Sequence, residues 1–399
     1  ISGGRIVAGS DTRLQVAALL NDGLIGSDGD LDIDADDTIE NRGVLRAGDE
    51  LELVARGDVT NVSGRIEGSR VAITSAGGDI VNRRESAQYH YQRDNLSLSA
   101  TLQGAAGSIQ ASDAVELQAA GDIRLQGSAV SGGDVHMSAS AVAIDAVAET
   151  HDFAVGGRHD YYRESGTRHF ASQVDGRDIV ILSRGNTRIS GSQLVAGDGL
   201  HISAGDISIE AVDDSDYSAH GDRVSGMLSE TMSSRQSYAS RNVASRLNAA
   251  TVVLVTEQGD IELTGSQISA VGQLAMNSAG AIRIGAGHEE ALEESERREA
   301  GWFSGGSLYR QTEDLLGRAV TTAFSSEIEA DSLALSATGD LQVNGAVIAA
   351  AGGINAEAGH IRLQHALSEE TVYSEHREVT ISLGDLAESL VDPGGLITV

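Results

Sequence analysis

Three residue types are absent or nearly absent in this 399-residue chain, and their absence limits which folds and functions are possible. There is no cysteine, which excludes disulfides and zinc sites built on thiolates. There is no lysine either, so every one of the 28 basic residues is arginine. Without lysine the chain cannot contain a P-loop, a Schiff-base lysine or a Ser–Lys catalytic pair. Only one proline is present, which suits a protein whose strands are nearly all hydrogen-bonded on both sides.

Positive charge is also scarce. Fifty-nine acidic residues against 28 basic residues give a net charge of −31. A surface of this sign repels nucleic acid and anionic lipid, so we expect no nucleic-acid partner. No apolar run approaches the 18 or so residues of a membrane-spanning helix. The chain begins at Ile1 without a methionine or signal peptide, and we interpret it as an internal fragment of a larger protein.

What the chain does contain is a recurring phrase. Gly121-Asp-Ile-Arg-Leu-Gln-Gly127-Ser returns with its second glycine at Gly191, Gly265 and Gly345. These glycines lie 64, 74 and 80 residues apart. Long, uneven periods indicate one structural unit that is copied several times, with insertions of different length between the copies.

Within each copy, apolar and polar residues alternate with the period of a β-strand. A second period of about 20 residues relates Val115 to Val135 and Leu341 to Ile361. Short strands at this spacing, separated by glycine-rich turns and without helices, predict an all-β fold, a parallel β-helix (solenoid) with laterally protruding β-hairpin insertions. At about 25 residues a coil and about 4.8 Å a step, we expect roughly 16 coils and a rod of about 75 Å. An array of antiparallel β-sandwiches is the rival interpretation, but the phrases lack its Asn-Gly hairpin signals.

The predicted organisation is one continuous solenoid with regular coils at 1–84 and interrupted coils at 85–399. We place the insertions at about 85–103, 147–176, 212–249, 286–327 and 366–390. Segment 147–176 is interpreted as a hairpin, whereas Glu289–Glu294 is compatible with a helical turn or an acidic arm.

All 13 aromatic residues fall in the insertions. One interpretation is mechanical, because a narrow coil holds aliphatic layers and the hairpins need large side chains to cover their own faces. The other is that the hairpins are contact elements, because aromatics are enriched at interfaces and at lipid headgroups. The candidate contact residues are Phe153, Tyr161, Tyr162, Phe170, Tyr217, Tyr238, Trp302, Phe303, Tyr309 and Tyr373.

Two groups of residues raise the question of a metal. Aspartates alternate from Asp28 to Asp36 and imitate the start of a calcium loop, but Ala35 replaces the required glycine and Asn41 the final glutamate. On a strand these carboxylates would share the outer face. His151, His159 and His169 share one insertion, but their spacing matches no helical ligand pair. We therefore expect no metal and no cofactor.

Catalytic motifs are missing as well. Gly285-Ala-Gly287 lacks the third glycine of a dinucleotide loop, and neither a Gly-x-Ser-x-Gly elbow nor a His-Glu-x-x-His motif occurs. A pair of acids for glycoside hydrolysis remains a distant alternative, because β-helix enzymes place such acids on an outer sheet. We expect no enzymatic activity and no catalytic residue.

The phrases Asn61–Gly68, Ala76–Asn82 and Ala120–Ser128 resemble filamentous haemagglutinin repeats. The insertion Arg298–Ser307 is similar to insertions of the second haemagglutinin-repeat region of contact-dependent growth inhibition effectors of the CdiA type, as are Glu149–Phe153 and Ser165–Phe170. The resemblance spans essentially the whole chain.

The resemblance implies a right-handed parallel β-helix, secreted to the cell surface of a Gram-negative bacterium through an outer-membrane two-partner-secretion transporter. It also implies that this region engages the target-cell outer membrane, or a surface receptor there, and assists toxin delivery. A haemagglutinin or adhesin shaft, which attaches cells or spaces a distal tip, is the alternative. We expect a monomeric filament. The family has no active site to transfer onto these positions.

Overall fold

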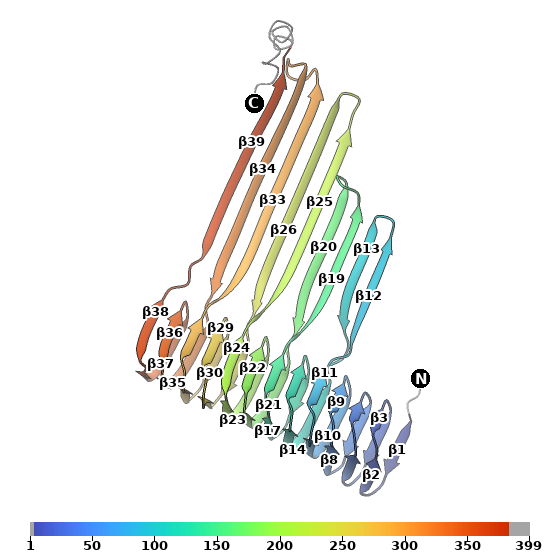
Figure 1. Cartoon of the computed structure of the whole chain (residues 1–399), viewed down its shortest axis with the longest axis vertical. Helices are drawn as coiled ribbons and strands as arrows, with labels where there is room; N and C mark the ends of the chain where they lie inside the picture. The colour runs from blue at the N-terminus through green and yellow to red at the C-terminus, as the bar shows by residue number, and fades with distance from the viewer. Residues whose placement is uncertain (1–3, 383–399) are drawn as a thin grey trace.

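The computed structural model describes residues 4–382, and these residues form 39 β-strands and no helix. The strands build a rod of stacked coils and a second, antiparallel sheet that rises from one side of the rod (Figure 1). Each regular coil contributes three strands, so the rod has three faces. The all-β parallel β-helix predicted from the sequence is thereby confirmed.

The first and second faces together form an 18-stranded parallel sheet. Strands of the first face are β1 (Arg5–Ala8), β4 (Leu24–Ser27), β7 (Val44–Ala47), β10 (Arg65–Ser75), β14 (Ser108–Ala119), β16 (Ala129–Ser131), β21 (Gln173–Ser183), β23 (Gln193–Ala204), β27 (Arg246–Ala249), β30 (Gln267–Ala270), β35 (Glu327–Ala337) and β37 (Val347–Glu357). The second face adds β2 (Thr12–Val16), β5 (Leu31–Ala35), β8 (Glu50–Ala55), β17 (Asp134–Ala139), β28 (Thr251–Thr256) and β31 (Gln273–Ser278). Longer strands such as β10 run through both faces, with a shift of register at the bend between Gly68 and Arg70.

The third face is a separate parallel sheet of 12 strands. These are β3 (Leu19–Asn21), β6 (Ile39–Asn41), β9 (Val59–Val62), β11 (Ile80–Arg83), β15 (Ile123–Gln126), β18 (Val142–Asp145), β22 (Asn186–Ser190), β24 (Asp206–Glu210), β29 (Ile261–Thr264), β32 (Ile282–Gly285), β36 (Asp340–Asn344) and β38 (His360–Gln364). One strand per coil means 12 coils in the described part of the chain. The expectation of about 16 coils is therefore wrong, because it divided the whole chain, insertions included, into coils of about 25 residues.

The core consists of aliphatic ladders. Leu31 lies next to Leu51 and then Val71 along the second face, and all three are fully buried. The alternation that predicted strands also places their neighbours, such as Asp32 and Glu52, on the outer surface. Complete burial of each such aliphatic side chain favours folding by about 1.5–3 kcal/mol, so the ladders are the main source of the rod's stability.

Buried polar ladders mark the corner between the third face and the first face of the next coil. The side chains of Asn21, Asn41, Asn61 and Asn82 form an amide chain in which each Nδ2 donates to the next Oδ1 at 2.7–2.8 Å. Further along, a serine ladder takes over, in which each backbone N–H donates to the hydroxyl of the next coil at 3.2 Å; its members are Ser128, Ser172, Ser192, Ser245, Ser266 and Ser326. These contacts satisfy polar groups that the corner removes from water.

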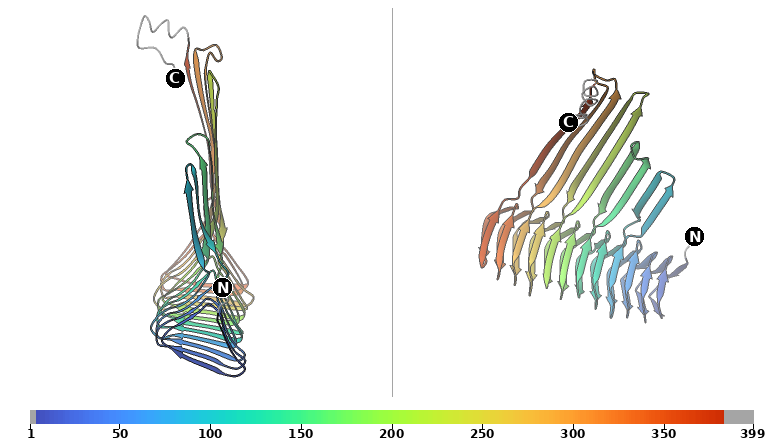
Figure 2. Two further views of the ribbon diagram at one scale, coloured as in Figure 1. Left: turned by 90° about the vertical axis from the view of Figure 1, so that its right-hand side faces the viewer. Right: turned by 45° about the horizontal axis from the view of Figure 1, so that its top comes forward.

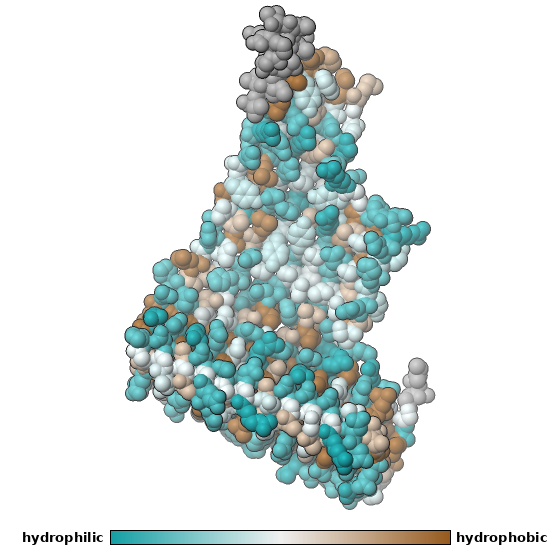
Figure 3. Space-filling model, in the orientation of Figure 1, coloured by the Kyte–Doolittle hydropathy of each residue, from teal (hydrophilic) through white to brown (hydrophobic). Residues whose placement is uncertain are grey.

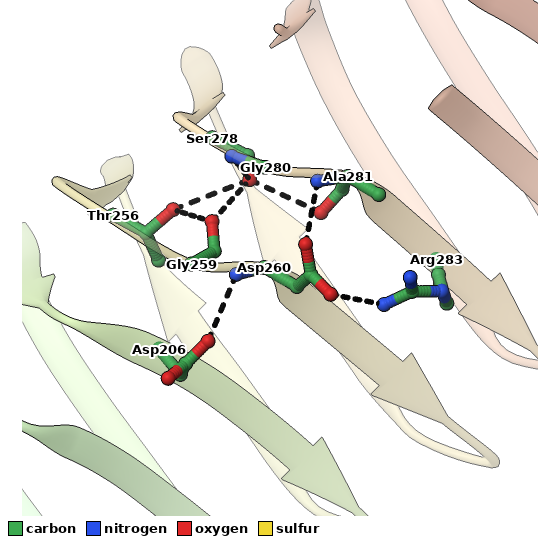
Figure 4. Close-up of polar contacts among 8 residues, drawn as sticks. All are labelled: Asp206, Thr256, Gly259, Asp260, Ser278, Gly280, Ala281 and Arg283. Carbon is green, nitrogen blue, oxygen red and sulfur yellow. Dashed lines mark hydrogen bonds and ion pairs between the residues drawn. The ribbon is translucent and has the colours of Figure 1, made fainter. Parts of the chain in front are cut away.

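The corner between the second and third faces explains the Gly-Asp pair of the recurring phrase. There the carboxylate of one coil accepts the backbone N–H of the next coil (Figure 4). Asp206 Oδ1 accepts from Asp260 N at 3.0 Å, and Asp260 Oδ1 accepts from Ala281 N at 2.6 Å. The other oxygen of Asp260 pairs with Arg283.

We expect this corner to weaken in acid. The Ala281 N–H, and then Arg283, hold the pKa of Asp260 below its usual value. A depressed folded-state pKa contributes stability above the ordinary carboxyl pKa of about 3.9, and that contribution is lost as the pH falls below it. Asp260→Ala should therefore lower the melting temperature at pH 7, and the difference from wild type should become smaller as the pH falls below about 3.9.

The control is Glu257→Ala, which removes an exposed acid from a turn of the same coil. Thermal unfolding followed by circular dichroism across pH 2–7 makes the comparison. A pH-independent difference between Asp260→Ala and wild type would show that the carboxylate contributes nothing through its charge.

Candidate interaction surface

The remaining nine strands form one continuous antiparallel sheet, called the fin below (Figure 2). Its strands in order are β12 (Ser86–Arg93), β13 (Leu96–Gln103), β19 (Val147–Gly156), β20 (Tyr161–Phe170), β25 (Val212–Ser225), β26 (Ser229–Val243), β33 (Gly287–Trp302), β34 (Tyr309–Phe324) and β39 (Glu369–Ile381). The fin is one layer thick, so both of its faces meet solvent. The predicted protruding hairpins thus exist, but they pair with one another as well as within themselves.

The fin is continuous because of where its hairpins leave the rod. Each of the four hairpins whose two strands are described follows a third-face strand and returns to the first face of the next coil, and β39 also follows a third-face strand, so all of them leave from one corner. Between successive hairpins lies one coil that turns without an insertion. At about 4.8 Å a coil, the hairpins are about 9.6 Å apart, which is the width of two strands. Neighbouring hairpins therefore meet at the spacing that backbone hydrogen bonds require.

The recurring phrase identifies the coils that lack a hairpin. Its second glycines, Gly127, Gly191, Gly265 and Gly345, have φ values of +58°, +56°, +57° and +65°. A positive φ is accessible to glycine at little steric cost, so the chain turns there directly into the next coil. The hairpins themselves end at Phe170 and Val243, whereas residues 173–176 and 246–249, which the sequence assigned to insertions, belong to coil strands β21 and β27.

Segment 286–327 is the pair β33 and β34, so the acidic run Glu289–Glu294 is a strand and not a helical turn. The predicted insertion 366–390 contains β39, and its residues after 382 lie outside the described part of the chain.

Several predicted contact aromatics serve the sheet itself. The ring of Tyr161 covers Gly221 on the next strand, and Tyr373 covers Gly317 while its hydroxyl donates to Glu294 Oε2 at 2.6 Å. An aromatic ring over a cross-strand glycine shields backbone that would otherwise be bare. Phe170 lies at the base of the fin under the guanidinium of Arg84, 4.7 Å from the ring centre. These contacts support the mechanical interpretation for these three rings.

Other aromatics face outward. Phe153 and Tyr162 pack with ring centres 6.1 Å apart, and they lie on the same side of the fin as the exposed Tyr89, Tyr91 and Leu98. Tyr217 and Tyr238 are directly paired at the centre of the fin and are half-buried. The first hairpin therefore has one apolar side and one polar side, and the apolar side continues onto Phe153 and Tyr162 of the second hairpin.

Several exposed apolar side chains gather at the free end of the longest hairpins. Trp302 and Tyr309 pack there in a tilted arrangement with ring centres 5.1 Å apart, and Phe303 follows in a left-handed conformation. The backbone N–H of Trp302 donates to Leu228 O at 2.8 Å, which joins this turn to the turn of the neighbouring hairpin. That second turn carries Met227, whose side chain is 98% exposed.

We call this end of the fin the tip; its apolar members are Val224, Met227, Leu228, Trp302, Phe303 and Tyr309. Apolar residues are visible at this end in Figure 3. The three non-aromatic members were not among the contact residues predicted from the sequence, although an apolar Met-Leu pair directly after Gly226 in a predicted insertion could have indicated them.

Neither metal candidate assembles a site. In β5, Leu31 and Ile33 point inward, while Asp32 and Asp34 lie on the outer surface. His151 lies over Gly166, and His169 contacts Asp214 at 3.1 Å. Across the described residues, no three His, Cys, Asp or Glu side chains gather as a metal centre. The same part of the chain contains no helix that is long and apolar enough to span a membrane.

Sequence comparisons agree with the resemblance inferred above. Two profiles described as haemagglutinin repeats match the chain, one at residues 2–84 and the other at 86–156, 140–226 and 224–380. The toxin CdiA of Escherichia coli is 34% identical over 133 residues, which cover 33% of this chain and 4% of that protein. The 16S rRNA endonuclease CdiA of Enterobacter cloacae is 31% identical over 134 residues, with 33% and 4% covered.

A tRNA nuclease CdiA from E. coli strain STEC_O31 is 26% identical over 212 residues, covering 51% of this chain and 6% of the nuclease. The chain thus spans only a small part of the curated relatives that it matches. No solved structure gives a significant match. The repeat profiles, however, extend over almost the whole rod and fin, and the chain belongs to the haemagglutinin-repeat family.

Proposed function

We propose that this chain is a non-catalytic filament segment of a secreted two-partner exoprotein, and that its tip engages the outer membrane of a target cell. The matched CdiA proteins support this context, because they are named as toxins and nucleases while the matched residues are a few per cent of their length. Export through an outer-membrane transporter to the cell surface, and assistance to toxin delivery, are part of the same proposal.

The observation that carries the proposal is the composition of the tip. Phe303 is 71% exposed in the turn between β33 and β34, and Met227 is 98% exposed in the turn between β25 and β26. Both turns lie at the end of the fin that points away from the rod (Figure 1). Burying side chains of this size in an apolar phase is favourable by about 1.5–3 kcal/mol each. Trp302 and Tyr309 are of the types that settle at the headgroup level. The negative charge of the chain opposes contact with anionic headgroups. The free energy gained by burying the apolar side chains of the tip must therefore exceed that repulsion.

The single tryptophan makes the test direct, because Trp302 alone reports on the tip. On addition of outer-membrane vesicles in buffer with Mg²⁺, we expect a blue shift of its fluorescence and quenching by bromine-labelled lipids. Replacing Met227, Leu228 and Phe303 together by serine should reduce vesicle binding by at least about tenfold.

The matched control replaces Leu20 and Val271 by serine, because these two exposed aliphatic residues lie on the rod. We expect this control to bind vesicles like wild type. Vesicle binding with an unshifted Trp302 spectrum, or equal loss in both variants, would contradict a role for the tip.

Attachment as an adhesin shaft is the second candidate, and one feature favours it. A shallow hollow of about 590 Å³ lies mid-way along the fin, where small Ser233, Ser295 and Ser374 lie beside Arg235 and Leu316. Hydroxyl and guanidinium donors around an apolar floor suit a polar surface ligand. Binding of purified surface glycans that is lost in Arg235→Ala, without any Trp302 shift, would favour this function over membrane engagement.

A further inference from the structure

The fin has an open edge at β12. Within the described residues, β12 pairs with β13 alone, and all eight of its residues are exposed. Gly104 N donates to Glu85 O, so odd-numbered residues of this strand bond to β13. The N–H and C=O groups of Ser86, Gln88, His90 and Gln92 consequently point away from the fin.

This edge lacks the usual protection. Sheet edges are normally blocked by charged residues, proline or bulges. Strand β12 has none of these in its interior, because its only charged residue is Arg93 at the end, and its eight pairs with β13 run without a shift of register. The outermost described strand on the other side, β39, contrasts with it and carries Glu369, Glu370, Glu375, Arg377 and Glu378.

There is also room beside β12. The first three coils turn tightly at Asp22-Gly23, Arg42-Gly43 and Ser63-Gly64, and none of them carries a hairpin. The rod therefore extends beyond β12 towards the N-terminus, whereas the fin ends at β12 (Figure 1). Hairpins elsewhere need two coils each, or about 9.6 Å. The space above these coils is therefore wide enough for two further strands.

We propose that β12 binds an extended polypeptide segment of a partner protein as an added β-strand. The chemistry of the two sides defines the segment. Tyr89 and Tyr91, which are 56% and 48% exposed, lie on the apolar side with Leu98, whereas Gln88 and His90 lie on the polar side. The fitting segment alternates apolar and polar residues, because successive side chains of an added strand fall on opposite sides. This inference is independent of the function proposed for the tip.

The probe is a labelled synthetic octapeptide that copies residues 96–103, whose alternating sequence already pairs with the inner side of β12. We expect saturable binding to the full chain in fluorescence anisotropy. His90→Pro removes an outward N–H without removing a bond to β13, and it should weaken binding at least about tenfold. Two peptides that are N-methylated on alternate amides should differ by a similar factor, because only one set of amides faces the edge.

Circular dichroism of His90→Pro checks that the fold is intact, and His376→Pro on β39 is the matched control, with unchanged binding. Equal binding of both methylated peptides, or of a peptide with the same residues in a non-alternating order, would overturn the proposal. So would sedimentation showing that wild type dimerises through β12, because the edge would then serve a second copy of the chain.

Discussion

Deleting residues 245–265 should split the fin while a shorter rod stays folded. The deletion removes one hairpin-free coil and places Ser266 in the position of Ser245, so the serine ladder is kept. The aliphatic ladder is kept as well, because Ile268 replaces Leu247 and Ile282 replaces Ile261. The third and fourth hairpins would then leave from adjacent coils, about 4.8 Å apart instead of 9.6 Å.

Two strands need twice that width, so β26 and β33 cannot keep their 11 paired residues. Hydrogen–deuterium exchange followed by mass spectrometry should show loss of protection in 229–243 and 287–302. The control deletes residues 22–41, which form one coil of the hairpin-free part of the rod, and should leave exchange in the fin unchanged. Full protection of β26 and β33 in the 245–265 deletion would mean that coil spacing does not govern the fin.

The second large effect is expected in the rod. Leu254 is 0% exposed and lies between Ile202 and Met276 of the adjacent coils. Leu254→Ala should lower the free energy of unfolding by about 3 kcal/mol, because the close-packed ladders on both sides cannot collapse into the cavity. Its neighbour Val253 points outward on the same strand, and Val253→Ala should cost less than about 1 kcal/mol.

Urea unfolding followed by circular dichroism compares the two variants. Similar losses in both would indicate that this strand is not packed with alternating inner and outer faces. A loss for Leu254→Ala of under about 1 kcal/mol would indicate that neighbouring side chains can move to fill the cavity, and that the core is not closely packed.

The rod was predictable because the sequence of each strand shows, by its alternation of apolar and polar residues, which side chains face the core. The alternation around Val115 and Leu117 gives the strand, and the 20-residue offset to Val135 gives the neighbour in the next coil. Both signals are local and periodic. The number of coils was overestimated because the sequence does not state how many insertion residues leave the rod.

The joining of the hairpins could not be inferred from any one insertion, because the pairing between β26 and β33 depends on the height of a coil. A signal for it does exist in the recurring phrase. The intervals of 64, 74 and 80 residues increase with the enclosed hairpins, which run from 147 to 170, 212 to 243 and 287 to 324. What remains of each interval is about two coils, and two coils equal the width of one hairpin.

The sequence indicated a set of candidate contact aromatics, but not which of them cover the sheet and which project into solvent. Sequence alone could not separate Tyr373, which covers Gly317, from Phe303, which projects into solvent, because the difference lies in the cross-strand neighbour. Register decides which ring meets a glycine, and register is set by coils far away in the sequence.

The absence of cysteine allows the central claim, that separate hairpins join into one sheet, to be measured with a single engineered disulfide. Ala239 on β26 and Ala291 on β33 face each other across a junction between hairpins. Their pair has no mutual backbone hydrogen bonds, because hydrogen-bonded pairs alternate with non-bonded ones along the strands, and Leu228, just before β26, bonds to Trp302 of β33. Cα atoms of such pairs are about 4.5 Å apart, within the range that a disulfide spans. Under mild oxidation the Ala239→Cys/Ala291→Cys variant should cross-link almost completely, whereas Ala239→Cys/Val320→Cys, two strands apart, should not. Failure of the first pair to cross-link in a folded rod, or equal cross-linking of both pairs, would contradict the continuous fin.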